Sequence, residues 1–272
     1  MSERQIPAWS LTAEAQGSIG IPSEWPERVT REWAIDGATG EGIDVCILDS
    51  GVDGNHPLVG ELESAVAVQM DGDEATIVPD EIGDVCGHGT ACAGIVRALA
   101  PNCRLHSIRV LGEGNTGSGN LILGGLRHAI ERGFDIVNLS LSTTKRSFAE
   151  LLHELADSAY FQGTVLVASA HNMPVESYPW RFSSVISVGS HEGTDAYEWY
   201  ANPDPPVEFF ARGIDVDVAW SGGGTLRCTG NSFAAPHIVG LSTLVLSKHR
   251  GLTPFQLKSV LYLTAANTGG TE

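Results

Sequence analysis

The stretch TGNSFAAPHIVG, from Thr229 to Gly240, places a serine at the start of a long apolar segment. Pro236 suits the first turn of a helix, and the basic run Lys248 to Arg250 suits the last turn. Gly251 follows that run, as glycine often does just past a helix end. The pattern therefore predicts a helix that begins near Ser232.

Ser232 has two explanations at this position. Serine is a preferred N-cap residue, so its role there is explained by helix capping alone. A nucleophile presented by the helix start is the other explanation, and it requires a base and an orienting acid elsewhere in the chain. This stretch alone leaves both explanations open.

Composition limits the class of protein. The chain has 272 residues, of which 42% are hydrophobic, so it can fill a sizeable core. Its formal net charge is −17. Nucleic acids and anionic lipids attract basic surfaces, so we expect neither a nucleic-acid partner nor a membrane. Solubility is the simplest explanation of the charge.

The cysteines and the first residues of the chain bear on the cellular location of the protein. The five cysteines are an odd number without regular spacing, which argues against a disulfide framework. The beginning of the chain is polar and lacks the apolar core of a signal peptide. Because no apolar run reaches membrane-spanning length, we expect a cytoplasmic protein.

Strand and helix patterns alternate through the middle of the chain. Strands are predicted at 43–48, 104–111, 134–141, 164–168 and 185–188, and helices at 90–99, 121–132 and 148–161. Such alternation predicts an α/β fold in which helices cover both faces of a mostly parallel sheet. We expect one domain over 31–272, preceded by an irregular arm at 1–30, with an acidic loop at 71–84.

Four polar residues stand where a parallel sheet collects its active groups. Asp49 and Asn172 follow predicted strands, and His88 and Ser232 stand at predicted helix starts. A histidine base, a carboxylate, a serine and an amide donor are the parts that acyl transfer requires. Each residue alone also has an ordinary structural explanation, as a turn, surface, loop or capping residue.

The segments VCILDSGVDGNHP, CGHGTACAGI and TGNSFAAPHIVG resemble the three signature blocks of the subtilisin-like (subtilase) serine peptidases, in the family order Asp, His, Ser. The resemblance extends over about 31–266. It implies a single-domain subtilisin-like fold and serine endopeptidase activity. It also implies that Asp49 is the orienting acid, His88 the base, Ser232 the nucleophile and Asn172 the oxyanion donor.

The resemblance further implies that substrate binds as an extended strand between two chain segments. These segments are Asn115, Thr116 and Gly117 on one side and Ser140, Leu141 and Ser142 on the other. It places Met173 and Ser177 at the main specificity pocket, where we expect an apolar or medium-sized substrate residue.

Several positions depart from the family pattern. His171, Ser142 and Thr143 stand where the family usually has glycine. Their side chains narrow the predicted cleft, which favours processing of a restricted set of protein or peptide precursors over general protein turnover.

The resemblance implies no required cofactor. Leu58 stands where the strongest calcium site of the family has its aspartate, so that site lacks a ligand, and we expect no metal. The acidic stretch at 71–84 lacks a calcium-loop pattern and is predicted to be a solvated loop. Cys92 matches the thiol of the proteinase-K-like branch and is expected to pack beneath His88.

Two questions stay open at the level of sequence. QIPAW, at 5–9, is similar in character to the cleft-crossing inhibitory segment of intracellular relatives, but an arm without any regulatory role explains it equally well. A catalytically inert subtilase-fold binding or regulatory module is the alternative to an enzyme. Nothing in the sequence indicates the oligomeric state.

Overall fold

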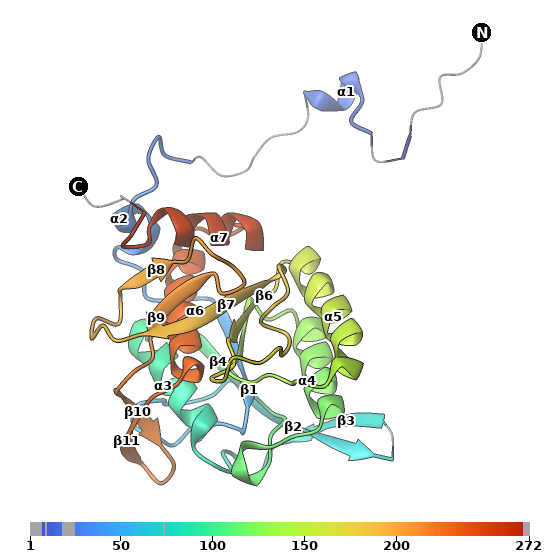
Figure 1. Ribbon diagram of the computed structural model, residues 1–272, viewed down its shortest axis with the longest axis vertical. Helices are drawn as coiled ribbons and strands as arrows, with labels where there is room; N and C mark the ends of the chain where they lie inside the picture. The colour runs from blue at the N-terminus through green and yellow to red at the C-terminus, as the bar shows by residue number, and fades with distance from the viewer. Residues whose placement is uncertain (1–6, 9, 18–24, 73, 269–272) are drawn as a thin grey trace.

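The computed structural model describes residues 7–8, 10–17, 25–72 and 74–268, and its centre is a nine-stranded sheet (Figure 1). The strand order is β3-β2-β4-β1-β5-β6-β7-β9-β8, and only the edge strands β3 and β8 pair antiparallel. The strands are β1 (Asp44–Asp49), β2 (Ser64–Asp71), β3 (Glu74–Pro79), β4 (Arg104–Arg109), β5 (Ile136–Leu139), β6 (Val165–Ser169), β7 (Val185–His191), β8 (Trp199–Ala201) and β9 (Phe209–Arg212). A separate hairpin joins β10 (Val216–Trp220) and β11 (Gly224–Cys228).

Helices cover both faces of the sheet, as Figure 1 shows. One apolar cluster includes residues of α3 and α6, and a second includes residues of α4 and α5. The helices are α1 (Ala13–Gln16), α2 (Arg31–Ile35), α3 (His88–Leu99), α4 (Gly119–Arg132), α5 (Ala149–Gln162), α6 (Asn231–Lys248) and α7 (Pro254–Leu263), with short 3-10 turns η1 (Glu113–Asn115) and η2 (Arg146–Phe148). The mostly parallel α/β fold expected from the alternating patterns is confirmed.

The site is positioned by two buried elements. β1 is central and buried along almost its whole length, because a parallel strand covered on both faces excludes water. It ends at Asp49. α6 is apolar around most of its circumference and runs through the core, with its first turn at the carboxyl edge of the sheet.

The acidic segment 71–84 differs from the predicted solvated loop. Residues 74–79 of it form the edge strand β3, which pairs with β2 in a hairpin. The segment then turns inward, and the Asp80 side chain is fully buried against Arg109, at 3.0 Å. The residues of β3 are mostly exposed or half-buried, so a strong period-two alternation of apolar residues, the usual sign of a strand, is missing there.

The N-terminal side of the domain is attached through α2. The Lys248 amine donates hydrogen bonds to the carbonyl oxygens of Glu32 and Asp36, and the His249 ring stacks on Trp33 at 3.9 Å between centroids. Most of the proposed inhibitory segment at 5–9 lies outside the described residues. None of the described helices has the length and apolar character needed to span a bilayer.

Candidate active site

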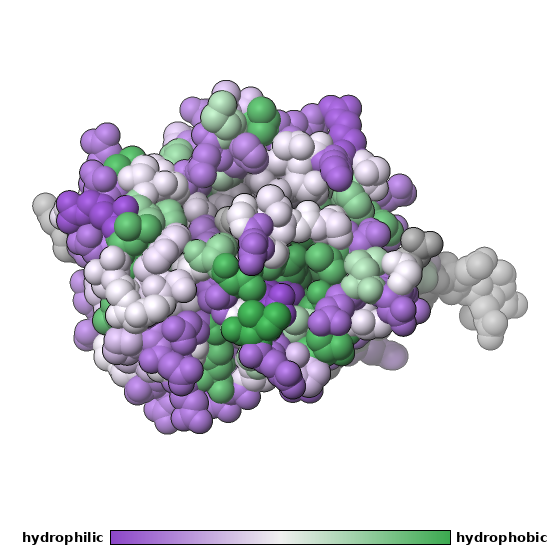
Figure 2. Space-filling view, turned by 90° about the horizontal axis from the view of Figure 1, so that it is seen from below, coloured by the Kyte–Doolittle hydropathy of each residue, from purple (hydrophilic) through white to green (hydrophobic). Residues whose placement is uncertain are grey.

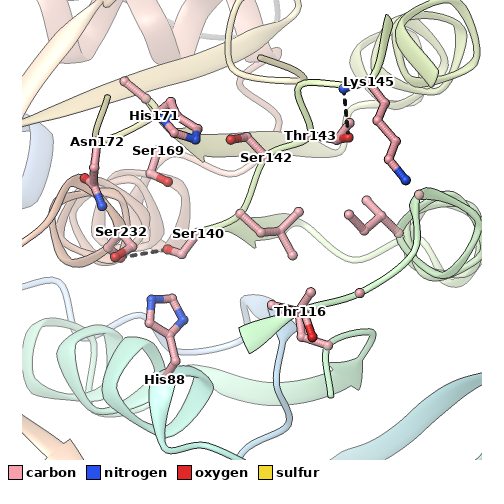
Figure 3. A pocket seen from close by; sticks show the side chains of 16 residues that line it. His88, Thr116, Ser140, Ser142, Thr143, Lys145, Ser169, His171, Asn172 and Ser232 are labelled. Carbon is pink, nitrogen blue, oxygen red and sulfur yellow. Dashed lines mark hydrogen bonds between the residues drawn. The ribbon is translucent and has the colours of Figure 1, made fainter. Parts of the chain in front are cut away.

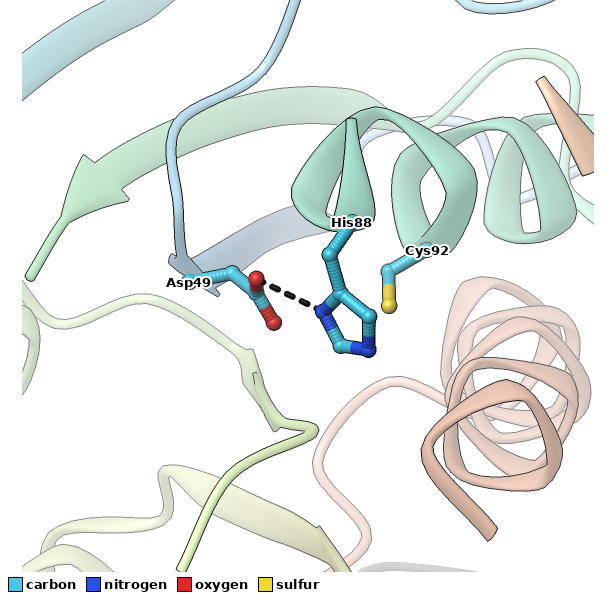
Figure 4. Close-up of side chains that lie close together, drawn as sticks. All are labelled: Asp49, His88 and Cys92. Atoms are coloured by element: carbon cyan, nitrogen blue, oxygen red, sulfur yellow. Dashed lines mark hydrogen bonds and ion pairs between the residues drawn. The ribbon is translucent and has the colours of Figure 1, made fainter. Parts of the chain in front are cut away.

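The end of β1 and the start of α3 bring a carboxylate and an imidazole together (Figure 4). His88 Nδ1 lies 2.8 Å from Asp49 Oδ1, and the Asp49 side chain has no exposed surface. The Ser50 amide also donates to Asp49 Oδ1, at 2.8 Å. Oδ2 of Asp49 is buried without a hydrogen-bond partner among the described residues, so its charge is balanced chiefly by the ring. This contact fixes the ring tautomer that leaves Nε2 free to accept a proton.

The surroundings of His88 favour the protonated ring. Burial lowers the pKa of His88, but the charge of Asp49, the hydrogen bond to Asp49 and the charge of Asp84 together raise that pKa above its usual value. A base with a raised pKa accepts a proton from a hydroxyl group more readily.

A second carboxylate, Asp84, closes the start of α3. Its Oδ1 accepts hydrogen bonds from the Cys86 and Gly87 amides at 3.0 and 2.8 Å, and its Oδ2 from the Thr90 amide at 2.8 Å. Hydroxyl groups of Ser50 and Thr90 donate to it as well. The carboxylate therefore satisfies amides that a helix start leaves unpaired, directly beside His88.

Gly87 permits the close packing of this turn. Its φ is +92°, a left-handed conformation that favours glycine, and a Cβ atom there would lie 2.8 Å from the Trp220 ring. The β10–β11 hairpin thus packs against the residue that precedes the base.

The start of α6 presents Ser232 to the same groove as His88, as Figure 3 shows. Its N-cap residue, Gly230, provides no side-chain cap, and among the described residues the Ser232 amide makes no hydrogen bond. A Cβ atom on Gly230 would lie 3.3 Å from Ser232 Oγ and 3.5 Å from Asn172 Nδ2, so glycine keeps the space between them open. The structure gives no capping role to the Ser232 side chain.

The Asn172 amide is oriented by one contact. Its Oδ1 accepts a hydrogen bond from the Asn231 amide at 2.9 Å. Because an N–H group can only pair with the oxygen, the Nδ2 donor is left facing the space beside Ser232. Two donors without a hydrogen bond among the described residues, Asn172 Nδ2 and the Ser232 amide, therefore flank the site where an oxyanion would form.

A groove of about 370 Å³ runs past these groups. The face shown in Figure 2 carries apolar residues around a hollow that also holds polar side chains. The residues lining the groove are His88, Leu111, Thr116, Gly117, Gly119, Ile122, Ser140, Leu141, Ser142, Thr143, Lys145, Ser169, Ala170, His171, Asn172 and Ser232. No carboxylate is among them, although the chain carries a net charge of −17.

The structure brings together five of the residues expected to bind substrate. Thr116 and Gly117 form one wall of the groove, and the segment from Ser140 to Ser142 forms the facing wall. Asn115 ends the 3-10 turn η1 and precedes the first wall.

Met173 and Ser177 do not line this groove. Met173 is exposed and borders an adjoining cavity of about 450 Å³. Ser177 is fully buried, and its hydroxyl accepts a hydrogen bond from Trp180 Nε1 at 2.8 Å. The expected place of Ser177 at the specificity pocket is therefore wrong, because its side chain is buried and bound to Trp180.

Cys92 lies beneath His88 (Figure 4). One ligand atom each of Asp49, His88 and Cys92 lie within 4.8 Å of one another, so the three residues could in principle hold a metal ion. Burial raises the pKa of the Cys92 thiol well above its usual value, and the charge of Asp49 raises it further. A metal would require the thiolate and would compete with His88 for Asp49, so this set fits the catalytic pair better than a metal site.

The inward-facing carboxylates of the acidic segment are also engaged within the protein. Asp80 pairs with Arg109, and Asp84 binds the start of α3. Neither side chain is therefore free to serve as a calcium ligand without breaking these contacts.

Two residues of the site differ from what the sequence indicates. Asp84 belongs to the predicted solvated loop but lies at the start of α3, four residues before His88. Lys145 borders the groove, although no local pattern places the loop after Thr143 there.

Comparisons with known proteins agree with this geometry. The sequence profile described as the subtilase family matches residues 40–272. Subtilisin DY of Bacillus licheniformis is 30% identical over 265 residues, covering 92% of each chain. Subtilisin of Bacillus pumilus is 29% identical over 253 residues, covering 86% of this chain and 88% of its own sequence. The crystal structure of a cold-adapted subtilisin-like serine proteinase has a TM-score of 0.70 at 26% identity, covering 86% of this chain and 88% of that one.

Proposed function

The chain belongs to the subtilase family and is a serine endopeptidase, and we propose that Ser232, His88 and Asp49 carry out the hydrolysis of a restricted set of peptide substrates. The observation that carries the assignment of residues is the single groove shared by His88, Asn172 and Ser232, with Asp49 bound behind the ring.

In the proposed reaction, Ser232 Oγ attacks the carbonyl carbon of the scissile peptide bond while its proton passes to His88 Nε2. The Asn172 amide group and the Ser232 N–H stabilise the negative charge that develops on the carbonyl oxygen. The protonated ring then gives its proton to the leaving amine, which leaves an acyl group on Ser232. Water, activated by His88, releases that acyl group and regenerates the hydroxyl.

The alternative of a catalytically inert module is not favoured. The contact between Asp49 and His88, and the presence of His88, Asn172 and Ser232 along one groove, support the enzyme over the inert module.

The proposed restriction of substrate rests on the side chains of the groove. Ser142, Thr143 and His171 narrow its wall where the family commonly has glycine. Lys145 adds a positive charge, and among the described residues it has no ion-pair partner. An extended segment that places an acidic side chain opposite Lys145 would fit this groove better than a basic one.

A peptide library cleaved by the enzyme tests this specificity. We expect enrichment of Asp or Glu at one position near the scissile bond, and we expect Lys145→Ala to abolish that enrichment while leaving the other positions unchanged. Arg127→Ala, which removes an exposed cation on α4, is the matched control and should keep the wild-type profile. A cleavage profile without enrichment of Asp or Glu, or an enrichment that is unchanged in Lys145→Ala, would contradict the proposed preference for acidic substrates.

A cytoplasmic location and independence from metals are further parts of the proposal. Cys46, Cys92, Cys103 and Cys228 form no disulfide bond, which supports a reducing compartment. Activity that is unchanged by EDTA would support the absence of a required calcium ion, whereas reversible loss of activity would contradict it.

A further inference from the structure

The helix that carries Ser232 lacks one backbone hydrogen bond in its first turns. In an α-helix the N–H of residue i+4 donates to the carbonyl of residue i. The residue four positions after Ser232 is Pro236, which has no N–H group. The main-chain carbonyl of the nucleophile therefore cannot receive its helical hydrogen bond.

A side chain from another element fills this position. The Ser140 hydroxyl donates to the Ser232 carbonyl oxygen at 2.8 Å, as the dashed line in Figure 3 marks. Ser140 follows β5 and is almost fully buried, at 6% exposure. The contact therefore ties the first turn of α6 to the end of a central strand.

Neighbouring groups support the same contact. The Asn138 amide donates to Ser140 Oγ at 3.0 Å, and the hydroxyl lies nearer to the Ser232 carbonyl, at 2.8 Å, than to Asn138 Oδ1, at 3.4 Å, so the hydroxyl hydrogen is better placed toward α6. The Cys92 thiol donates to the same Ser232 carbonyl at a sulfur–oxygen distance of 3.6 Å. Because a thiol is a weak donor, Ser140 supplies the stronger of the two bonds.

We propose that Ser140 is a positioning residue, whose hydroxyl replaces the hydrogen bond that Pro236 removes and so holds the Ser232 peptide in its reactive position. The proposal rests on the assignment of Ser232 as the nucleophile. Small displacements of a reacting group reduce the rate strongly, so we expect Ser140 to affect kcat far more than KM.

The structure supplies a direct test, because the missing donor can be restored. Ser140→Ala should lower kcat about tenfold, with KM changed by less than about twofold. Pro236→Ala returns an N–H group four residues after Ser232, and alone it should stay within about threefold of wild type. In the double variant the helical N–H takes over the bond, and kcat should return to within about twofold of Pro236→Ala.

Three outcomes would overturn the proposal. They are an unchanged kcat in Ser140→Ala, a double variant whose loss is the product of the two single losses, or a change confined to KM. Ser142→Ala is the matched control on the same wall of the groove. Its effect should multiply with that of Pro236→Ala, because the Ser142 side chain makes no hydrogen bond to α6 among the described residues.

Further measurements separate this proposal from loss of folding and from the failure of the proposed function. Ser140→Cys keeps a weak donor, so its kcat should lie between those of wild type and Ser140→Ala; a kcat no higher than that of the alanine variant would count against the hydrogen bond. A thermal unfolding measurement on each variant checks that a lower kcat is not caused by loss of the folded state. If wild type fails to react with a fluorophosphonate probe at Ser232, the assignment of the nucleophile fails first.

Discussion

The two helix starts at the active site are built in opposite ways. The start of α3, which carries His88, is closed by Asp84, whose carboxylate binds the Gly87 and Thr90 amides. The start of α6, which carries Ser232, has a glycine at its N-cap and one amide bound by a side chain, that of Asn231 by Asn172, and it leaves the Ser232 amide without a hydrogen bond among the described residues.

The difference reflects what each group does in the reaction. The base must keep one orientation, so the Gly87, Gly89 and Thr90 amides around it donate to side chains of the protein. The oxyanion exists only during the reaction, so the donors that bind it must be left unpaired in the resting enzyme. Asn172 illustrates the same division within one side chain, since Oδ1 is held by Asn231 while Nδ2 stays free.

Among the variants that alter the surroundings of His88 at the start of α3, Asp49→Asn should cause the largest loss of kcat. An asparagine amide can present an N–H group to His88 Nδ1 and stabilise the wrong ring tautomer. We expect kcat to fall about 10⁴-fold with the fold retained. Steady-state kinetics together with thermal unfolding would check this, and a loss below tenfold would contradict the assigned role of Asp49.

Asn172→Ala removes an oxyanion donor at the start of α6. Removal of one oxyanion donor should lower kcat about 10²–10³-fold with little change in KM, because the donor acts mainly in the transition state. Asn102→Ala, on the surface away from the groove, is the matched control and should have wild-type kinetics. An effect confined to KM would indicate that Asn172 binds the substrate and does not stabilise the oxyanion.

Asp84→Asn sharpens the comparison at the start of α3. The charge of Asp84 helps to raise the pKa of His88, so its removal should lower that pKa. The acidic limb of the kcat/KM profile, which reports protonation of the base, should then shift to lower pH. Loss of the cap should also destabilise the protein by about 1–2 kcal/mol. A shift of the acidic limb to higher pH would contradict the inference that the charge of Asp84 raises the pKa of His88.

Lys258→Ala should have the smallest effect on activity, since it lies away from both helix starts. Its amine donates to the Ser183 and Val185 carbonyls and to Glu208 Oε1, at 2.7–2.9 Å. Its loss leaves a half-buried carboxylate unpaired, so unfolding should become easier by about 2 kcal/mol while kcat stays unchanged. Denaturant unfolding measures the change in the free energy of unfolding. A lower kcat in the folded variant would contradict the expectation that Lys258 stabilises the fold without affecting the active site.

Much of the site could be predicted from the sequence because its parts lie in short local patterns. Asp49 follows an apolar strand, and His88 and Ser232 stand at helix starts flanked by small residues, so the fold places them together. The strands β1, β4, β5, β6 and β7 and the helices α3, α4 and α5 were likewise predicted, with ends within three residues of the observed ones, whereas β2, β3, β8 and β9 were not.

The contacts that support the site are harder to predict. The hydrogen bond from Ser140 to the Ser232 carbonyl joins residues 92 positions apart, so it depends on tertiary packing. Asp84 binds amides only two to six positions further along the chain, but its acidic segment has the composition of a solvated loop. The burial of Ser177 depends on how its loop packs against the rest of the fold.

The central claim is that the open start of α6 presents a reactive serine beside its oxyanion donors. Intact-mass and peptide analysis after incubation with a fluorophosphonate probe tests it most directly, with Ser232→Ala as the control. We predict one adduct per chain, located on Ser232, and none in the Ser232→Ala variant. An unlabelled wild-type protein, or an adduct that persists in the Ser232→Ala variant, would contradict the account.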